Sequence, residues 1–285
     1  MRNVLVSGGS GFIGSNIVSL LQKKKYNVTV LDKKKPKNLN VKFIKSDLSN
    51  LQKLIKITKK IDYIFHLAGV SDINKVKKIP TITIKDNIIS MTNLLESAKV
   101  NKTKRFIFAS SIYAHGNSGN LYTTSKIAAE NIIKNYSLLY KTKYTILRFA
   151  TAYGTNNRGA DVISLFFNNA INNKNIIVHG NGKQTRDFIN SKDIAICSLK
   201  VLKKRYENKT LTIGNKKKIK IIDIAKLIKR ITNTKSKILI NKNKKRFDDF
   251  DLNKLKKIPP HNYLTFKTKN SLKKDLEKML KDYQS

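Results

Sequence analysis

A tyrosine and a lysine four residues apart, Tyr122 and Lys126, are the side chains in this sequence best suited to acid–base chemistry. On a helix, residues with this spacing lie on one face and can interact. The phenol of a tyrosine is a poor base at neutral pH, because its usual pKa is about 10. A nearby ammonium group favours the phenolate and would lower the pKa of Tyr122 toward the catalytic range. The spacing alone also fits an ordinary helix surface, so its meaning depends on the rest of the chain.

A glycine-rich turn near the amino terminus offers a binding site for a dinucleotide. Residues 2–7 read as a buried strand, which runs into Gly8, Gly11 and Gly14 as a helical pattern begins. Such a turn lets the backbone approach a pyrophosphate at the amino terminus of the helix. A second strand ends in Asp32, whose carboxylate would accept hydrogen bonds from the adenosine ribose hydroxyls. This order of strand, turn, helix, strand and acid predicts a dinucleotide-binding unit.

The glycine spacing and the Tyr122–Lys126 pair together resemble the extended short-chain dehydrogenase/reductase family, which includes the nucleotide-sugar epimerases and dehydratases. The resemblance covers nearly the whole chain and implies that the cofactor is NAD. Asp32 also favours NAD because its carboxylate repels the 2′-phosphate of NADP, although Lys33 and Lys34 would offset part of that repulsion. The cofactor-binding residues that the resemblance implies are Gly8, Gly11, Phe12, Ile13, Gly14, Asp32, Asp47, Leu48, Leu67, Ala68, Gly69, Asn87, Tyr122 and Lys126.

The resemblance also implies a catalytic serine at the end of the strand that precedes the tyrosine helix. Counting along the epimerase pattern places Ser111 in this position, with Ser110 as the neighbouring alternative. Its hydroxyl would hydrogen-bond the reacting sugar hydroxyl, so the implied catalytic residues are Ser111, Tyr122 and Lys126. The pattern has a tyrosine where this chain has His115. This difference affects the loop conformation more than the chemistry, since Tyr122 and Lys126 already supply the base.

Several polar residues resemble the contacts that the family makes with its sugar nucleotide. Arg186 lies in a segment that follows the family closely, and it would bind the diphosphate, for which a bidentate guanidinium is well suited. Arg246 matches a later arginine of the family more loosely, as a second diphosphate ligand; either arginine could instead form a surface ion pair. Thr151 stands where the family has a substrate-contacting asparagine. The implied substrate-binding residues are Ser71, Ser111, Tyr122, Thr151, Arg186 and Arg246.

The residues around Ser111 distinguish between reactions within the family. The dehydratases that resemble this chain need an aspartate–glutamate pair beside the serine or threonine, and the decarboxylases carry a glutamate there. The stretch 110–114 contains no carboxylate, which disfavours both reactions. The loop 117–121 is also shorter than in typical epimerases of the family, which implies a more open sugar pocket.

We therefore expect an NAD-dependent nucleotide-sugar 4-epimerase that acts through a transient 4-keto intermediate. One alternative is an NAD(P)H-dependent nucleotide keto-sugar reductase, which would use the same residues once and then exchange its cofactor. A second alternative is a non-catalytic NAD-binding regulator, although such proteins commonly lose the tyrosine or the lysine, and both are present here.

The composition is typical of a globular protein without a nucleic-acid partner. Of the 285 residues, 40% are hydrophobic and 27% are charged, and the formal net charge is +41. A charge of this size can indicate binding to nucleic acid. The positive residues are mostly lysines spread along the chain, however, so we expect no specific nucleic-acid partner. The charge would still raise the local concentration of anionic substrates such as nucleotide sugars.

Targeting and membrane signals are not evident in the sequence. No apolar run is long enough to span a bilayer, and the first strand begins almost at Met1, which leaves no room for a signal peptide. The single cysteine, Cys197, excludes an internal disulfide. We expect a cytoplasmic protein with no membrane partner and no metal site.

The order of elements predicts an α/β protein with a Rossmann-like doubly wound parallel sheet and a smaller carboxy-terminal substrate-binding lobe. Strands are expected near residues 2–7, 27–31, 41–45, 62–67, 104–110 and 144–148. Helices are expected near residues 11–24, 50–59, 86–99, 122–141, 160–173, 191–204, 221–231 and 271–283.

This order suggests an NAD-binding domain over residues 1–150 and a mixed α/β substrate-binding lobe over 151–285, with some exchange of strands and helices between them allowed. The resemblance further implies a homodimer that packs helices 86–99 and 122–141 of each subunit together.

Overall fold

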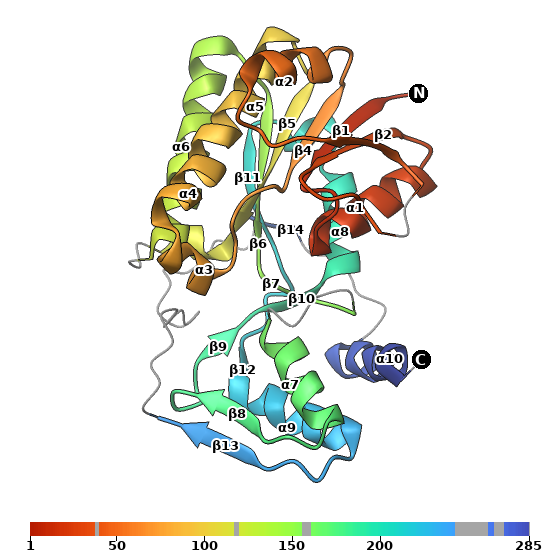
Figure 1. The fold of residues 1–285 in the computed structure, drawn as a ribbon, viewed down its shortest axis with the longest axis vertical. Helices are drawn as coiled ribbons and strands as arrows, with labels where there is room; N and C mark the ends of the chain where they lie inside the picture. The colour runs from red at the N-terminus through yellow and green to blue at the C-terminus, as the bar shows by residue number, and fades with distance from the viewer. Residues whose placement is uncertain (38–39, 117–119, 156–160, 243–261, 265–270, 285) are drawn as a thin grey trace.

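The computed structural model describes residues 1–37, 40–116, 120–155, 161–242, 262–264 and 271–284. These residues form two lobes, drawn one above the other in Figure 1. The sheet lobe contains a large parallel sheet with helices on both faces. The small lobe contains helices α7, α9 and α10 and several short strands.

The sheet lobe is built on eight strands in the order β14-β11-β6-β5-β4-β1-β2-β3. Each pairing between them is parallel. The order changes direction between β1 and β4, which is where an open parallel sheet binds its ligands. The strands are β1 (Asn3–Ser7), β2 (Asn27–Asp32), β3 (Lys42–Lys45), β4 (Tyr63–His66), β5 (Arg105–Ser111), β6 (Tyr144–Phe149), β11 (Lys209–Ile213) and β14 (Tyr263–Leu264).

Both faces of this sheet are covered, so its central strands carry apolar side chains on both faces. In β1, Val4 and Val6 belong to the core on one face, while Leu5 belongs to the core on the other, as the alternation of side chains in a strand requires. Helices α1 (Phe12–Lys23) and α8 (Ser191–Lys200) pack against each other on the first face, and α2 (Leu51–Thr58), α5 (Ser90–Val100) and α6 (Leu121–Tyr140) cover the second. The predicted fold class is confirmed.

The helix predicted over residues 86–99 is part of a longer helical run. After α3 (Ile73–Lys78), α4 (Pro80–Ile84) leads into a π-helical turn (Lys85–Ile89), which continues directly into α5. Such a turn inserts an extra residue into a helix and is frequent at functional sites. Here it contains Asn87, which is buried.

The small lobe has its own hydrophobic core, which includes Tyr153, Phe167, Val178, Ile224 and Leu276. Strands β7 and β10 pair in parallel, as do β8 and β13, while β9 and β12 pair antiparallel. The helices of this lobe are α7 (Val162–Ile171), α9 (Ile221–Thr232) and α10 (Leu272–Gln284). Its strands are β7 (Thr151–Tyr153), β8 (Ile176–His179), β9 (Thr185–Arg186), β10 (Phe188–Asn190), β12 (Ile219–Lys220) and β13 (Ile238–Asn241).

The chain passes between the lobes several times. Helix α8 and strands β11 and β14 follow residue 150 in the sequence but belong to the sheet lobe, where β11 pairs with β6. The division into 1–150 and 151–285 therefore stays a prediction, with the exchange of elements that it allowed. In the part of the chain that the structure describes, no helix is long and apolar enough to cross a membrane.

Candidate active site

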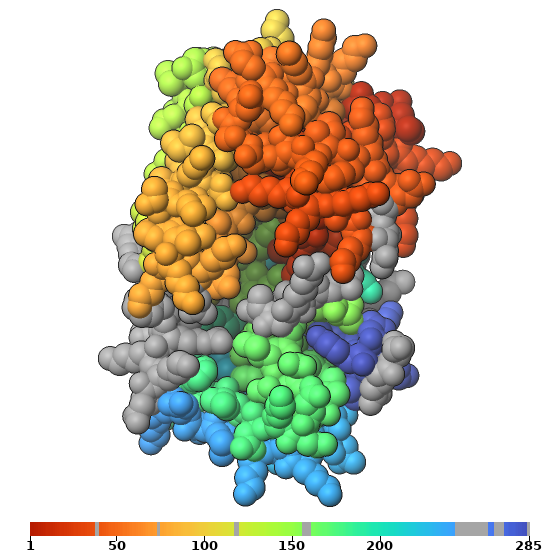
Figure 2. All heavy atoms as spheres, in the orientation of Figure 1, coloured from red at the N-terminus to blue at the C-terminus, as the bar shows by residue number. Residues whose placement is uncertain are grey.

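A cleft of about 1580 Å³ opens at the carboxyl ends of the sheet strands and is lined by residues of both lobes. Figure 2 shows a hollow between the orange and red segments of the sheet lobe and the green segment of the small lobe. Ligand pockets commonly measure about 300–1,000 Å³, so this cleft has room for two ligands. The predicted site residues that line it are Gly8, Gly11, Phe12, Ile13, Gly14, Asp32, Asp47, Leu48, Leu67, Ala68, Gly69, Ser71, Ser111, Tyr122, Lys126, Thr151 and Arg186.

The glycine turn between β1 and α1 is packed too tightly for side chains. Gly8 has a φ of +75°, and a Cβ there would lie 2.5 Å from the backbone nitrogen of Ala68. A Cβ on Gly14 would clash with the carbonyl oxygen of Gly8. Gly11 caps α1 without a side-chain hydrogen bond, so the first amides of this helix remain available to an anion. This cradle fits the pyrophosphate of a dinucleotide.

The carboxylate of Asp32 is fixed at the end of β2. Its Oδ2 accepts a hydrogen bond from the backbone nitrogen of Ser10 (3.0 Å), and its Oδ1 accepts one from that of Lys34 (3.2 Å). Lys33, one of two lysines that could offset the repulsion of a 2′-phosphate by Asp32, forms an ion pair with Asp86 at 3.2 Å. The geometry therefore favours a ribose with free hydroxyls at this position.

Asp47 lines the cleft immediately after β3. Its Oδ1 accepts hydrogen bonds from the hydroxyl (2.6 Å) and the backbone nitrogen (3.2 Å) of Ser49. These bonds hold the pKa of Asp47 below its usual range. Asp47 is therefore an ionised acceptor at neutral pH, next to the apolar side chain of Leu48.

Asn87 belongs to the predicted cofactor-binding residues, but it does not line the cleft. Its side chain is buried, with Oδ1 accepting a hydrogen bond from the backbone nitrogen of Val70 (2.7 Å). Its Nδ2 donates to the carbonyl oxygen of Val70 and to the hydroxyl of Ser125, both at 3.0 Å. Asn87 thus ties the loop after β4 to helix α6, one layer behind the cleft.

Helix α6 presents Tyr122 and Lys126 to the cleft from its first two turns. Asn120 caps the helix and fixes where it begins. The Nζ atom of Lys126 donates a hydrogen bond to the carbonyl oxygen of Ala109 (2.8 Å) and lies 5.8 Å from the ring centre of Tyr122. Both side chains are buried, with 8% of each residue exposed.

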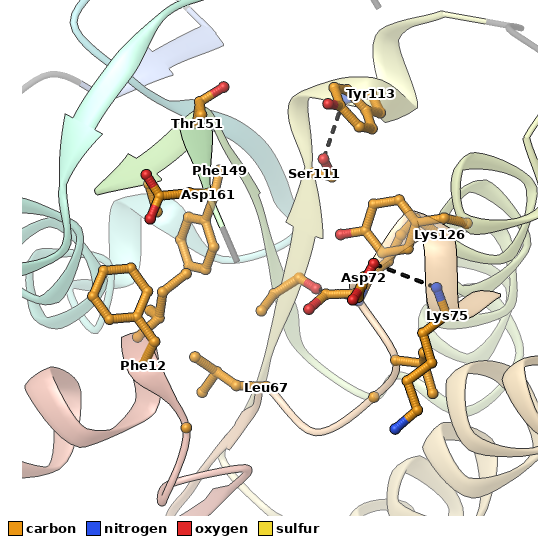
Figure 3. Close-up of a pocket in the computed structure, with 18 of the residues that line it drawn as sticks. Phe12, Leu67, Asp72, Lys75, Ser111, Tyr113, Lys126, Phe149, Thr151 and Asp161 are labelled. Carbon is orange, nitrogen blue, oxygen red and sulfur yellow. Dashed lines mark hydrogen bonds between the residues drawn. The ribbon is translucent and has the colours of Figure 1, made fainter. Parts of the chain in front are cut away.

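Ser111 ends β5 beside these two residues. Its Oγ accepts a hydrogen bond from the backbone nitrogen of Tyr113 (3.3 Å) in the 3₁₀ turn Ile112–His115. The Ser111 hydroxyl is also near enough to Tyr122 to lower the pKa of that phenol. Ser111, Tyr113 and Lys126 lie on one side of the close-up in Figure 3. The structure therefore brings the three predicted catalytic residues, Ser111, Tyr122 and Lys126, together.

The pKa of Tyr122 is raised in this structure, so burial outweighs the lowering effect expected of Lys126. Burial raises the pKa of Tyr122 to about 12, because an ionised phenol loses the solvation of water, and the nearby hydroxyl of Ser111 only partly opposes this shift. Burial also lowers the pKa of Lys126 to about 8, against the effect of the nearby Glu130 carboxylate. At neutral pH the pair is therefore a neutral phenol and a largely protonated amine.

The small lobe supplies the opposite wall of the cleft. Arg186 is 8% exposed, and its Nη1 donates a hydrogen bond to the carbonyl oxygen of Thr185 (3.1 Å). Figure 3 shows Thr151 across the cleft from Ser111. The predicted diphosphate ligand Arg246 lies outside the described residues, as do residues 117–119 of the short loop.

Sequence reasoning missed several residues that line the cleft, including Asp72, Lys75, Tyr113, Phe149 and Asp161. Asp161 accepts hydrogen bonds from the backbone nitrogens of Ile163 and Ser164, at 2.9 and 3.1 Å, and so caps α7. An acidic residue just before an apolar helical pattern was the available signal for this cap. The other four occupy a loop, a short helix, the 3₁₀ turn and a strand end, which no local pattern marks as part of a site.

Comparisons with known proteins agree with this geometry. The sequence model of the NAD dependent epimerase/dehydratase family matches residues 4–214. The chain is 30% identical over 249 residues to a candidate UDP-glucose 4-epimerase of Methanocaldococcus jannaschii, covering 79% of this chain and 81% of that one. It is 32% identical over 266 residues to dTDP-D-glucose 4,6-dehydratase of Homo sapiens, covering 82% and 75% of the two chains.

A solved structure has nearly the same fold over its full length. UDP-glucose 4-epimerase from Thermotoga maritima, crystallised with UDP-glucose, superposes with a TM-score of 0.88, at 25% identity and with 99% of each chain covered. The glycine cradle and Asp32 fit the dinucleotide that the family uses, so the expectations of an enzyme and of NAD as its cofactor are confirmed. On the sequence match and the shared fold, the chain belongs to the NAD-dependent epimerase/dehydratase family.

Proposed function

We propose that this protein is a nucleotide-sugar 4-epimerase that acts through a transient 4-keto sugar. The observation that supports this reaction best is the juxtaposition of Ser111, Tyr122 and Lys126 beside the glycine cradle, with no carboxylate in the 3₁₀ turn that follows Ser111. The solved epimerase described above has the same fold and was crystallised with UDP-glucose, so UDP-sugars are the substrates to test first.

In this proposal Tyr122 removes the proton from the sugar 4-hydroxyl and later returns it. Ser111 would hydrogen-bond the same hydroxyl and orient it toward the phenol. When bound, NAD would supply the hydride chemistry at carbon 4 that this reaction needs. Because burial raises the pKa of Tyr122 to about 12, the phenol needs the positive charge of Lys126, and that of the oxidised nicotinamide, to release its proton. The buried cleft strengthens both interactions, since water screens them little.

The cofactor would lie along the sheet lobe. Gly8, Gly11 and Gly14, with Phe12 and Ile13, would hold its pyrophosphate, and Asp32 its adenosine ribose. Asp47 and Leu48 would face the adenine, and Leu67, Ala68 and Gly69 would line the path to the nicotinamide. Asn87 would act by fixing that last loop rather than by direct contact.

The substrate would bind between the lobes. Arg186 and Thr151 line the cleft from the small lobe, and their guanidinium and hydroxyl groups would contact the diphosphate. Ser71 would face the sugar, and we retain Arg246 as a second diphosphate ligand on the sequence match alone.

The absence of a suitable acid argues against dehydration, the reaction named for the human relative. In dehydratases that resemble this chain, two carboxylates follow the catalytic serine or threonine. Here the corresponding residues are Ile112, which is buried, and Tyr113, which lines the cleft with an aromatic ring. Elimination of water from carbon 5 and carbon 6 would therefore lack its acid and base at this position.

We also propose that the protein works as a cytoplasmic homodimer. The face formed by α4, the π-helical turn, α5 and α6 exposes large apolar side chains, which isolated subunits would leave in water. These side chains are Ile82, Ile89, Val100, Leu138, Leu139 and Tyr140. The division into an NAD-binding domain (1–150) and a substrate-binding lobe (151–285) remains part of this proposal.

The test is to incubate the purified protein with UDP-glucose and other UDP-sugars and to analyse the products by nuclear magnetic resonance. We expect the 4-epimer to form without net consumption of NAD or NADH. Stoichiometric consumption of NAD(P)H with a keto sugar would identify a reductase instead, and a 4-keto-6-deoxy product would identify a dehydratase. No turnover of any nucleotide sugar would contradict the proposal.

A further inference from the structure

A buried carboxylate lies directly behind the active centre, one helical turn after Lys126. Glu130 is only 1% exposed. Its Oε1 accepts hydrogen bonds from the hydroxyl of Ser110 (2.6 Å) and from Nε of Arg148 (2.9 Å), and its Oε2 accepts one from Nη2 of Arg148 (2.6 Å). Desolvating a charged pair is expensive unless its hydrogen bonds are satisfied. Here the hydrogen bonds of the Glu130 carboxylate are satisfied by Ser110 on β5 and Arg148 on β6.

The arginine extends this network to the turn after Ser111. Nη1 of Arg148 donates a hydrogen bond to Nδ1 of His115 (3.0 Å), so Nδ1 is unprotonated and the proton lies on Nε2. Nε2 then donates to the hydroxyl of Thr212 on β11 (2.7 Å). Burial and the charge of Arg148 lower the pKa of His115 to about 4, which keeps the ring neutral. His115, which replaces the tyrosine of the epimerase pattern, is therefore a link in this network and not a base.

Two adjacent residues of β5 are held by two residues of α6. Lys126 binds the carbonyl oxygen of Ala109, and Glu130 binds the hydroxyl of Ser110. The next residue along β5 is Ser111, whose hydroxyl lies near enough to Tyr122, at the start of the same helix, to affect its pKa. Any slip between the end of β5 and α6 would therefore change the separation of the Ser111 and Tyr122 hydroxyls.

The charges that face Glu130 come from several elements. Arg148 on β6 is the closest, and Lys134 lies 3.9 Å away on α6. Burial raises the pKa of Tyr144 at the start of β6, and the Glu130 carboxylate raises it further. On the cleft side, the carboxylate raises the pKa of Lys126 against the effect of burial. His115, described above, is the remaining titratable group that faces this carboxylate in the described part of the chain. Because Arg148 neutralises much of the charge of Glu130, its main effect is geometric, with a smaller electrostatic effect on Lys126.

We propose that Glu130 is a positioning residue of the active centre, which holds the end of β5 against α6 and so sets the arrangement of Ser111, Tyr122 and Lys126. This inference rests on the proposed function for its kinetic test, but not for its structural one. The alternative is that Glu130 is only a stabilising ion-pair partner. The chain offers a matched control for that alternative in Glu207, which pairs with Arg105 at 2.7 Å near the other end of β5.

The kinetic test compares the NAD-bound forms of the wild type, Glu130→Gln and Glu207→Gln, with kcat and KM for the accepted nucleotide sugar measured across pH. Glutamine keeps the length and one acceptor oxygen but removes the charge. For Glu130→Gln we expect kcat to fall roughly ten- to hundred-fold, as for a small misplacement of reacting groups, with KM nearly unchanged. We also expect the alkaline limb of the kcat profile to move to lower pH by up to about one unit, because Lys126 loses a nearby negative charge.

Glu207→Gln should lower the melting temperature and leave both the kcat and the pH profile as in the wild type. An unchanged kcat and pH profile in folded Glu130→Gln, or the same changes in Glu207→Gln, would overturn the proposal. If Glu130→Gln does not fold, Ser110→Ala removes the tie to β5 and leaves the ion pair intact. In that variant we expect a reduced kcat without a shift in the pH profile, and a wild-type kcat would count against the proposal.

A crystal structure of each NAD-bound variant gives a readout that needs no turnover. In Glu130→Gln or Ser110→Ala the separation of the Ser111 and Tyr122 hydroxyls should change, whereas Glu207→Gln should retain the wild-type geometry. An unchanged Ser111–Tyr122 geometry in the first two variants would overturn the proposal. If the wild type turns over no nucleotide sugar, the proposed function fails, and this structural comparison still decides the role of Glu130.

Discussion

Two arginine–glutamate ion pairs lie near opposite ends of strand β5, and they differ in what surrounds them. At the amino end, Arg105 pairs with Glu207 and also donates hydrogen bonds to the carbonyl oxygens of Val201 (2.6 Å) and Lys203 (3.1 Å). These partners belong to the connection that follows α8. None of these four residues lines the cleft. The ion pair at the amino end of β5 therefore fixes the connection after α8 against the sheet.

At the carboxyl end, the pair of Arg148 and Glu130 contacts Ser110, which lines the cleft next to Ser111. Both pairs join an arginine to a glutamate, with closest distances of 2.7 Å and 2.6 Å. Their surroundings differ because a parallel sheet places its ligand crevice outside the carboxyl ends of its strands. The comparison suggests that substitutions at the carboxyl end should impair turnover, and that those at the amino end should impair stability alone.

Replacement of Tyr122 by phenylalanine should give the largest loss of turnover among the substitutions at the carboxyl end of the sheet. The ring is retained, so packing and NAD binding should be nearly unchanged, while the acid–base group is lost. Turnover of the nucleotide sugar should fall by roughly 10²- to 10⁴-fold, the usual contribution of such a group. Measurement of kcat, bound NAD and melting temperature on one preparation checks all three expectations. If activity survives, Tyr122 is not the acid–base residue.

The glycine turn, Asp32 and the expected catalytic residues could be predicted from the sequence because each is marked by a short local pattern. The turn from Gly8 to Gly14 and the acid Asp32 lie within one strand–helix–strand unit. The placement of Ser111 followed from counting along the epimerase pattern that this segment resembles. Such predictions are possible because the geometry of each short segment is set mainly by its neighbours in the sequence.

The network behind the active centre could not be predicted in this way. In the sequence, Lys126 and Glu130 are an oppositely charged pair four residues apart, which is also common on exposed helix surfaces. Their true partners, Ser110 and Arg148, come from two separate strands and meet Glu130 only in the fold. The raised pKa of Tyr122 was missed for a related reason, since it depends on burial and not on the sequence neighbours.

The return of the chain to the sheet lobe was also difficult to predict. Helix α8 and strands β11 and β14 follow the small-lobe segments in sequence, but they complete the sheet lobe. Strand β14 contains only Tyr263 and Leu264. A strand of two residues has no alternating pattern to detect.

A second carboxyl-end substitution, Gly14→Ala, should separate cofactor binding from acid–base chemistry. The new Cβ would clash with the carbonyl oxygen of Gly8 and lie 2.9 Å from the Cα of Gly9, so the cradle must shift. Such overpacking costs about 1–3 kcal/mol. If this cost is borne by a changed conformation of the glycine turn, the affinity for NAD should fall by roughly ten- to hundred-fold. Titration calorimetry with NAD checks this, with Tyr122→Phe as the control that retains affinity. Wild-type NAD affinity in Gly14→Ala would show that the cradle does not hold the cofactor.

At the amino end, Arg105→Met should reduce stability without affecting the reaction. The substitution leaves Glu207 without its arginine and removes two hydrogen bonds to backbone carbonyls. Glu207 is partly exposed and keeps Lys143 as a second partner at 3.1 Å, which limits the loss. We expect the free energy of unfolding to fall by about 2–3 kcal/mol in denaturant titrations. The value of kcat below the melting temperature should equal that of the wild type, and a large loss of kcat would remove the contrast between the two ends of β5.

The smallest expected effect is on the pH dependence of the free energy of unfolding. The carboxyl end of the sheet contains a buried titratable group that contributes to it. His66 at the end of β4 is 1% exposed, and burial lowers its pKa to about 3, with the charge of Lys126 acting in the same direction. In the unfolded chain its pKa is about 6.5. Between these values the unfolded state binds a proton that the folded state does not, so the contribution of His66 to stability is present above pH 6.5 and is lost as the pH falls.

His66→Asn should therefore flatten the decline of the free energy of unfolding in this range. The difference in slope between the wild type and the variant should be roughly 1 kcal/mol per pH unit between pH 6 and pH 5. Denaturant titrations at several pH values measure this difference, and Arg105→Met supplies a comparison from the amino end, with a lower stability but an unchanged slope. Parallel curves for the wild type and His66→Asn would mean that His66 does not remain neutral in the folded protein. The pH dependence would then have to come from other groups, and this distinction between the two ends of the sheet would be lost.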